Sequence, residues 1–215
     1  MTAVQMLDER ENGGIVRSLA TACTSRTMCP ECGHVDSTME TKANHPCQKC
    51  GIIIERRRLL FSSEHPLLEM IFECYRSDHA DTKKLCVLLF CALLEQHLLN
   101  LLKSRCIRLR IEWTVMELLL EKYEKVHERL KLFERLTGIK IREALVGLPV
   151  ASVFTTYDLL ARKRNGIAHG IPGATYSITD DDIKAAVNGA ADSFSCFAYL
   201  HNNYCAIDSP PLPSS

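Results

Sequence analysis

The chain has 215 residues, with 26 lysines and arginines and 26 aspartates and glutamates, so its formal charge at pH 7 is zero. This balance excludes a global positive field that would attract nucleic acid, and any contact with RNA must come from local basic clusters. The length is sufficient for one ordinary domain and a small appendage, with a helical core that needs no disulfides.

Cysteine usage and the first residues favour a reduced, cytoplasmic protein. The eleven cysteines are an odd number; four form two C-x-x-C pairs, and six others lie in apolar helical stretches, at positions 74, 86, 91, 106, 196 and 205. The start, MTAVQMLDER, has no basic segment followed by an apolar one, which argues against a secretory signal. The longest uncharged apolar run, 85–94, is about half of the ~20 residues that a spanning helix needs. We therefore expect no membrane insertion.

The N-terminal part divides into a leader and a ribbon. Residues 1–25 show no sustained periodicity and contain Asn12-Gly13-Gly14, which predicts a loose, partly disordered leader with room for one short helix. Residues 26–58 carry two knuckles, C-P-E-C-G and C-Q-K-C-G, separated by a short polar β-type stretch and followed by three isoleucines. This pattern predicts a small N-terminal β zinc ribbon.

The two knuckles supply the candidate metal ligands Cys29, Cys32, Cys47 and Cys50. The spacing within each pair, and the stretch 33–46 between the pairs, are typical of structural zinc sites. Four thiolates close the coordination shell, so we expect a structural zinc and no catalytic metal. Zinc binding in such modules contributes ~10–16 kcal/mol of apparent free energy, enough to fold a segment with almost no core. Two disulfides or exposed loop thiols are the alternative, and His34 and His45 are expected to be solvated loop residues.

The remainder, residues 60–207, predicts an all-α domain, and 208–215 predicts a disordered Pro-rich tail. Residues 81–103 are apolar on nearly every side between Leu85 and Leu94, which indicates a central helix. Residues 113–136 predict one amphipathic outer helix, and shorter helices are expected near 140–146 and over 151–164. Thr179 and Asp182 resemble a capping box at the start of the last helix. The overall fold class is therefore mostly α, a helical bundle with a small β zinc ribbon.

The segment ARKRNGIAHG, residues 161–170, carries the candidate chemistry in Arg164, Asn165 and His169. On an ideal helix His169 would lie about 140° from Arg164, so Gly166 is where we expect the backbone to leave the helix. A histidine can transfer protons near neutral pH, an arginine can hold a phosphate, and RNA supplies its own nucleophile in the 2′-hydroxyl. This combination predicts metal-independent RNA cleavage, giving a 2′,3′-cyclic phosphate and a 5′-hydroxyl.

Arg164, Asn165 and His169 match the R-x4–6-H motif of nucleases of the HEPN superfamily, in which a polar residue, commonly Asn, follows the arginine. Residues 60–207 as a whole resemble that superfamily. The resemblance implies a HEPN-like helical bundle, RNA as substrate, a homodimer that brings two motifs into one cleft, and a toxin or antiviral defence role with an antitoxin or other regulatory protein. It also implies that Glu95 is the polar residue near the motif. Ile171 stands where some toxin members carry a modifiable tyrosine.

Several alternatives stay open at this stage. Arg164-Asn165-Gly166 can be a helix C-terminus with a glycine cap, followed by His169 as an ordinary turn residue. A buried Glu95 needs a partner such as Arg164 or His169, but Glu95 can equally lie at the bundle edge, where His97 and Asn100 are expected. The domain can be a catalytically silent module that binds RNA or a protein, and a transcription-associated ribbon would leave most of the chain unexplained. Candidate RNA contacts are the basic clusters 56–58, 103–110 and 162–164.

Overall fold

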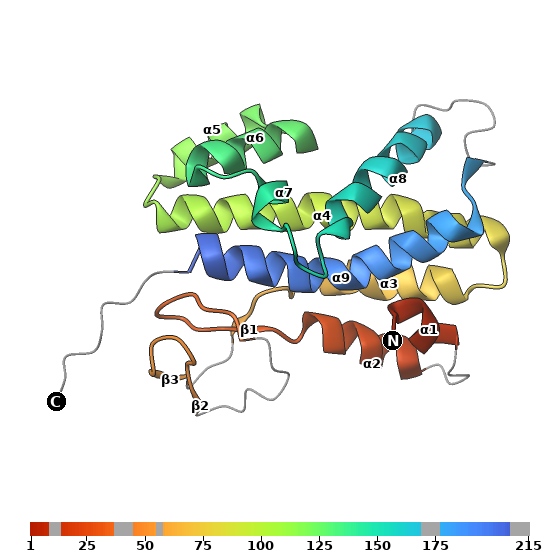
Figure 1. Cartoon of the computed structure of the whole chain (residues 1–215), viewed down its shortest axis with the longest axis horizontal. Coiled ribbons are helices and arrows are strands. Elements are labelled where there is room, and N and C mark those ends of the chain that lie inside the picture. Colours follow the sequence, from red (N-terminus) through yellow and green to blue (C-terminus); the bar gives the residue numbers. More distant parts are fainter. Residues whose placement is uncertain (9–13, 37–44, 55–57, 169–176, 207–215) are drawn as a thin grey trace. The chain divides into compact units, whose positions relative to one another are not determined.

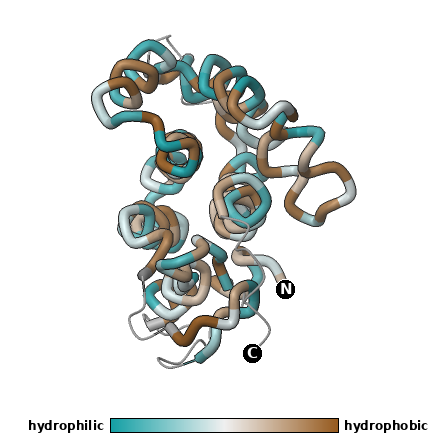
Figure 2. Tube along the Cα trace, turned by 90° about the vertical axis from the view of Figure 1, so that its left-hand side faces the viewer, coloured by the Kyte–Doolittle hydropathy of each residue, from teal (hydrophilic) through white to brown (hydrophobic). Residues whose placement is uncertain are grey.

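The protein is mostly helical, as predicted (Figure 1). The computed structural model describes residues 1–8, 14–36, 45–54, 58–168 and 177–206. These residues contain nine helices: α1 (Ala3–Asp8), α2 (Gly14–Thr24), α3 (His65–Arg76), α4 (Ala80–Arg108), α5 (Trp113–Lys122), α6 (Val126–Thr137), α7 (Ile141–Ala144), α8 (Ser152–Ala168) and α9 (Asp180–Tyr204). The helices seen in Figure 2 carry both apolar and polar residues, as amphipathic helices around a core should.

The chain forms two compact units, each assembled from three stretches. The first comprises residues 1–23, 63–97 and 145–196, and the second comprises 24–62, 98–144 and 197–215. The helices α4 and α9 contribute residues to both units. The ribbon segment groups with the end of α4, with α5 to α7 and with the end of α9.

The core of the first unit is built on the N-terminal part of α4. Its residues Cys86, Val87, Phe90, Cys91, Leu93 and Leu94 are fully buried, as the continuous apolar run predicted. Helix α9 approaches closely at Gly189, where a Cβ atom would lie 3.1 Å from ring carbons of Phe90. A Cβ atom there would be closer than an ordinary contact, so the Phe90 ring would have to shift by a few tenths of an ångström.

The N-terminal residues differ from the predicted loose leader. Helices α1 and α2 pack into the first unit through apolar residues at helical spacing: Ala3, Val4, Leu7, Ile15, Val16, Leu19 and Ala20. The side chain of Asn188 accepts a hydrogen bond from the Val4 backbone at 3.0 Å, and the Tyr75 hydroxyl donates to Asp8 at 3.0 Å. Burial, followed by Asp8, raises the pKa of Tyr75 to about 12. Two helices are present where one short helix was expected, because each is too short to give a sustained apolar period.

The predicted single helix over 113–136 is two helices, α5 and α6. The chain leaves helical geometry at Tyr123, with φ −106° and ψ 62°. The freed Tyr123 carbonyl accepts a hydrogen bond from Nε of Arg129 at 3.1 Å, and Glu128 accepts one from the Lys125 backbone at 3.3 Å. The apolar spacing continues across the break, so the periodicity gave no sign of it.

Arginines near the end of α4 cap other helices of the second unit. Arg105 donates to the Leu136 carbonyl of α6 at 2.8 Å and to the Tyr204 carbonyl of α9 at 2.7 Å. Arg108 donates to the Ala206 carbonyl. Helix C-termini present carbonyls without intrahelical partners, and cations are favourable there. Two members of the basic cluster 103–110 are therefore structural.

Helix α4 itself ends in a Schellman motif. The backbone of Arg110 donates to the Ile107 carbonyl and that of Ile111 to the Cys106 carbonyl, both at 3.0 Å. This pattern requires a left-handed residue, usually glycine, and here Arg110 occupies the position with φ 56°.

By length and composition alone, α4 could cross a membrane, with a mean hydropathy of 1.9 over its most apolar window. Of that window, 56% is buried inside the protein. A buried core helix satisfies the same criteria, so this finding is weak support for a membrane span.

The predicted start of α9 is confirmed. The Thr179 hydroxyl accepts from the Asp182 backbone at 3.3 Å, and Asp182 accepts from the Thr179 backbone at 2.7 Å. Lys163 of α8 donates to the same Asp182 carboxylate at 2.5 Å. The pKa of Asp182 is lowered because Lys163 and Thr179 together outweigh the effect of burial, which alone would raise it.

Candidate functional site

Short strands position the cysteine knuckles in the second unit. Strand β1 (Thr27–Met28) pairs antiparallel with β4 (Arg58–Leu59), and β2 (His45–Pro46) pairs antiparallel with β3 (Ile53–Ile54). Cys29 follows β1 directly, and Cys47 follows β2 directly. The predicted β ribbon with two knuckles is thus present among the described residues.

The two knuckles have the same backbone hydrogen bonds. Gly33 donates to the Cys29 carbonyl and Gly51 to the Cys47 carbonyl, both at 2.9 Å. Cys29 and Cys47 each donate in turn to the residue five positions later, both at 2.8 Å. The glycines take φ values of 70° and 72°, which side chains rarely adopt. Each knuckle therefore builds half of the site from its own few residues.

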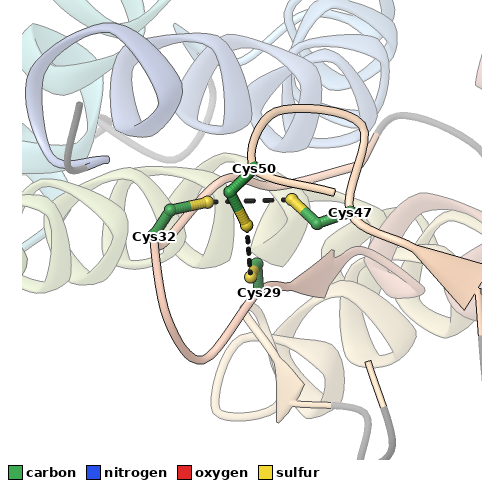
Figure 3. A group of neighbouring side chains, drawn as sticks. All are labelled: Cys29, Cys32, Cys47 and Cys50. Carbon is green, nitrogen blue, oxygen red and sulfur yellow. Dashed lines mark hydrogen bonds between the residues drawn. The ribbon is translucent and has the colours of Figure 1, made fainter. Parts of the chain in front are cut away.

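The four cysteines form one buried cluster (Figure 3). The Sγ atoms of Cys29 and Cys50 are 3.8 Å apart, those of Cys32 and Cys47 are 3.7 Å apart, and all four lie within 4.8 Å of one another. A tetrahedron with zinc–sulfur bonds of about 2.3 Å has edges of about 3.8 Å. The donor set and its spacing fit a structural zinc.

The alternatives for the cysteines do not hold. All eleven cysteines are free thiols, so the paired disulfides are excluded in this structure. Nε2 of His34 lies 3.8 Å from Oδ1 of Asp36, and His45 is exposed. The group of side chains close enough to share a metal ion consists of the four cysteines. Burial raises the pKa of Cys32 to about 12. Zinc binding would therefore displace protons from the cluster, as thiolates are the ligands.

Side-chain hydrogen bonds from α9 anchor the first knuckle within the second unit. Asn202 accepts from the Val35 backbone at 2.6 Å and donates to the Val35 carbonyl at 2.8 Å. Gly33 also lies close to the same end of α9, where a Cβ atom would be 3.6 Å from Cα of Ala206. The sequence showed no signal for this contact, since an asparagine on a helix is usually solvated.

A polar cluster in the first unit contains two of the predicted catalytic residues. Arg164 of α8 donates through Nη2 to Oε1 of Glu95 on α4 at 2.7 Å. Both side chains are partly exposed, at 27% and 29%. The structure thus brings Glu95 together with one of the two partners expected for it, and places the pair within reach of solvent.

The cluster has a third member, Tyr157, which the sequence reasoning missed. Its hydroxyl donates to the same Oε1 atom of Glu95 at 3.0 Å. Burial, followed by Glu95, raises the pKa of Tyr157. Burial alone would lower the pKa of Arg164, but Glu95, with smaller contributions from Cys91 and Tyr157, raises it overall. Arg164 therefore stays a cation. The spacing of seven residues between Tyr157 and Arg164, two helical turns, is the signal that could have identified Tyr157.

The other motif residues lie at the end of α8. Asn165 is exposed, and α8 continues through Gly166 to Ala168. The expected departure of the backbone at Gly166, and the alternative of a glycine cap there, are both wrong because Gly166 lies inside the helix. His169 follows the last residue of α8 and lies outside the described residues, as do Gly170 and Ile171.

His97, expected at the bundle edge, is instead buried. It is 1% exposed, lies 3.5 Å from the fully buried Glu64, and contacts the Phe194 ring edge-on at 4.6 Å. Burial lowers the pKa of His97, although Glu64 opposes the shift. The sequence could not show this because Glu64 lies 33 residues earlier. His97 is a core residue with a polar partner.

The basic residues expected to contact RNA differ in their surroundings. In the cluster 162–164, Lys163 contacts Asp182 and Arg164 contacts Glu95, while Arg162 is exposed. Arg56 and Arg57 lie outside the described residues. Within the described part of these clusters, Arg105, Arg108, Lys163 and Arg164 make intramolecular contacts.

Comparison of the chain with protein-family models, with curated proteins and with solved structures found no match. Its family is therefore not assigned. The chain is a helical protein with a buried cluster of four cysteines, able to hold a metal ion, beside short strands.

Proposed function

We propose that the protein is a HEPN-type endoribonuclease that cleaves RNA without a catalytic metal. In this proposal Arg164 and His169 act on the scissile phosphate, Glu95 orients Arg164, and Asn165 contributes a hydrogen bond to the RNA. The zinc held by the four cysteines has a structural role. The observation that supports the proposal most is the guanidinium of Arg164, which is partly exposed and held by Glu95. Arg164 lies five residues before His169 in the sequence.

The chemistry requires no cofactor. The 2′-oxygen forms a bond to phosphorus while the bond from phosphorus to the 5′-oxygen breaks. One imidazole takes the proton of the 2′-hydroxyl, and a second, protonated imidazole gives a proton to the departing 5′-oxygen. The guanidinium stabilises the extra charge on the phosphate oxygens in the transition state. Because one histidine cannot serve both roles from one position, the proposal includes a homodimer that brings two His169 residues to one RNA.

The biological setting within the proposal is a cytoplasmic toxin or antiviral defence effector, restrained by an antitoxin or another regulatory protein. It is an analogy with the resembling superfamily. Single-stranded RNA is the favoured substrate, since in-line attack by a 2′-hydroxyl needs a flexible backbone.

The test compares wild-type protein with His169→Ala and Arg164→Ala on a labelled single-stranded RNA. Arg162→Ala is the matched control, because Arg162 is an exposed arginine on the same helix. We expect a cyclic-phosphate product from the wild type and from Arg162→Ala, and a loss of at least 100-fold, about 2.7 kcal/mol in the barrier, in the other two. Circular dichroism verifies that all variants are folded. Cleavage that persists in both variants, or that EDTA abolishes while the fold persists, would contradict the proposal.

The second candidate is a catalytically silent module that binds RNA or a protein. The observation that favours it is the Arg164–Glu95 ion pair itself, since a 2.7 Å pair between packed helices can be purely structural. This candidate predicts RNA binding that survives both substitutions and yields no cyclic phosphate.

A further inference from the structure

One face of α8 carries both ends of the polar cluster. Val153, Tyr157, Leu160 and Arg164 follow one another at spacings of four, three and four residues, so they share a face of the helix. Val153 and Leu160 are buried and pack in the core, and Tyr157 is only 6% exposed. The hydroxyl of Tyr157 therefore has its direction set by the packing of its ring.

Glu95 accepts from two donors through one oxygen. Oε1 receives the Tyr157 hydroxyl at 3.0 Å and Nη2 of Arg164 at 2.7 Å. Both donors lie on α8 and the acceptor lies on α4, so the carboxylate is held between two points on one helix face. A carboxylate with a buried, rigid donor on one side has fewer accessible rotamers than one that contacts a flexible arginine alone.

The guanidinium of Arg164 depends on this carboxylate for its orientation. Its Nε atom is buried and makes no hydrogen bond within the part of the chain that the structure describes. Among those residues, the guanidinium makes its hydrogen bond through Nη2, to Glu95. Since a guanidinium holds a phosphate through a planar fork, a rotation of that plane changes which oxygens it can reach.

We propose that Tyr157 is a positioning residue, whose hydroxyl fixes Glu95 and, through Glu95, the plane of the Arg164 guanidinium. The expected effect on kcat rests on the proposed nuclease function. The expected effect on the orientation of the Arg164 guanidinium rests on the contacts alone. Tyr157 touches neither the RNA nor the reacting atoms. It acts on catalysis by keeping the arginine in the geometry that suits the phosphate.

The kinetic test is Tyr157→Phe, which removes the hydroxyl and keeps the ring. The matched control is Tyr75→Phe, because Tyr75 is also a buried tyrosine whose hydroxyl donates to a carboxylate, that of Asp8 on α1. Each variant removes a part-buried hydroxyl that donates to a carboxylate: to Oε1 of Glu95 for Tyr157, and to both oxygens of Asp8 for Tyr75. We expect kcat to fall roughly tenfold in Tyr157→Phe, with KM within about twofold of wild type, and neither constant to change in Tyr75→Phe.

A double variant tests whether Tyr157 acts through Glu95. In a Glu95→Ala background, Tyr157→Phe should change kcat by less than about twofold, because the acceptor that the hydroxyl positions is already gone. Equal losses of kcat in both tyrosine variants, or independent effects of Tyr157→Phe and Glu95→Ala, would overturn the positioning role and leave Tyr157 a packing residue.

A spectroscopic arm separates this inference from the nuclease proposal. The Nε–H resonance of Arg164 in ¹⁵N NMR spectra should shift or broaden in Tyr157→Phe and in Glu95→Gln, and stay unchanged in Tyr75→Phe. If wild-type protein cleaves no RNA but the resonance responds in this way, the nuclease proposal fails and the positioning of Arg164 by Tyr157 stands. An unchanged resonance in Tyr157→Phe overturns the inference whatever the activity.

Discussion

The cysteine cluster and the polar cluster are assembled in opposite ways. Each cysteine pair is formed by one knuckle of five residues, with a glycine at positive φ and the same backbone hydrogen bonds. The polar cluster joins Glu95 to residues 62 and 69 positions later, through the packing of α4 against α8. A site made by local backbone geometry is visible in sequence, whereas a site made by helix packing shows only those residues that carry an obvious charge.

The largest effect expected from this comparison concerns zinc. Removal of zinc, by a chelator or by Cys32→Ser, should unfold the knuckles, because metal binding supplies ~10–16 kcal/mol in such modules and the segment has little core. Hydrogen exchange should show loss of protection at the amides of Gly33 and Gly51. Cys74→Ser is the control, since Cys74 lies in α3 outside the cluster. A cluster that keeps its protection without metal would show that thiol packing alone holds the ribbon.

The next largest effect concerns the polar cluster. Glu95→Ala should lower the free energy of unfolding by about 1–3 kcal/mol, because it leaves a partly buried guanidinium and a buried hydroxyl without their acceptor. Urea denaturation measures the change.

The control for Glu95→Ala is Asp81→Ala. This substitution breaks an ion pair at the surface, in which Oδ1 of Asp81 lies 2.8 Å from Nζ of Lys84. Its effect should stay within about 0.5 kcal/mol, since exposed pairs contribute little. Equal effects of the two substitutions would mean that helix packing gives the polar cluster no advantage over a surface ion pair.

A third prediction tests how the local motif is attached to the helices of its own unit. Asn202→Ala should destabilise the second unit by about 1–3 kcal/mol, because it leaves both polar groups of Val35 without this partner. The neighbouring Asn203→Ala is the matched control, as Asn203 is exposed and its side chain donates to the Tyr199 carbonyl of its own helix. Thermal unfolding of the zinc-loaded protein measures both. Identical melting temperatures would exclude Asn202 as an anchor.

The smallest effect is a gain. Arg110→Gly should stabilise the protein by about 0.5–1 kcal/mol, because relief of the left-handed strain, about 1–2 kcal/mol, exceeds the entropy cost of glycine, about 0.5–1 kcal/mol. Arg110→Ala, which keeps the strain, is the control and should show no gain in the same denaturation experiment. A loss in Arg110→Gly would mean that the arginine side chain contributes more than its backbone strain costs.

The features that could be predicted from the sequence are those formed by local geometry, and the features that were missed are those formed by helix packing. The mostly helical class, the central apolar helix, the ribbon and the cap at Thr179 all depend on neighbouring residues, and all are present. The break at Tyr123 was missed because the apolar period runs through it. The helix was expected to end at Gly166 but continues to Ala168, since glycine inside a helix costs only about 1 kcal/mol and packing can supply that.

The candidate chemistry could be predicted only in part. Glu95 was recognisable as a charged residue in an apolar stretch and Arg164 by its spacing to Asn165 and His169, and the two side chains meet. Tyr157, Asn202 and Glu64 were missed because their partners are set by tertiary packing. For Tyr157, the spacing of seven residues to Arg164 is the one signal in the sequence.

Arg105 has one further consequence, for how the second unit opens. The guanidinium of Arg105 donates to carbonyls in the last turns of two different helices. Fraying of one helix end therefore breaks hydrogen bonds of the same side chain that still binds the other helix end. The ends of α6 and α9 should therefore exchange their amide protons with a common opening rate, as one cooperative unit, although they are distant in sequence. Lysine could not reproduce this linkage, because an ammonium group lacks the planar spread needed to reach both carbonyls at once.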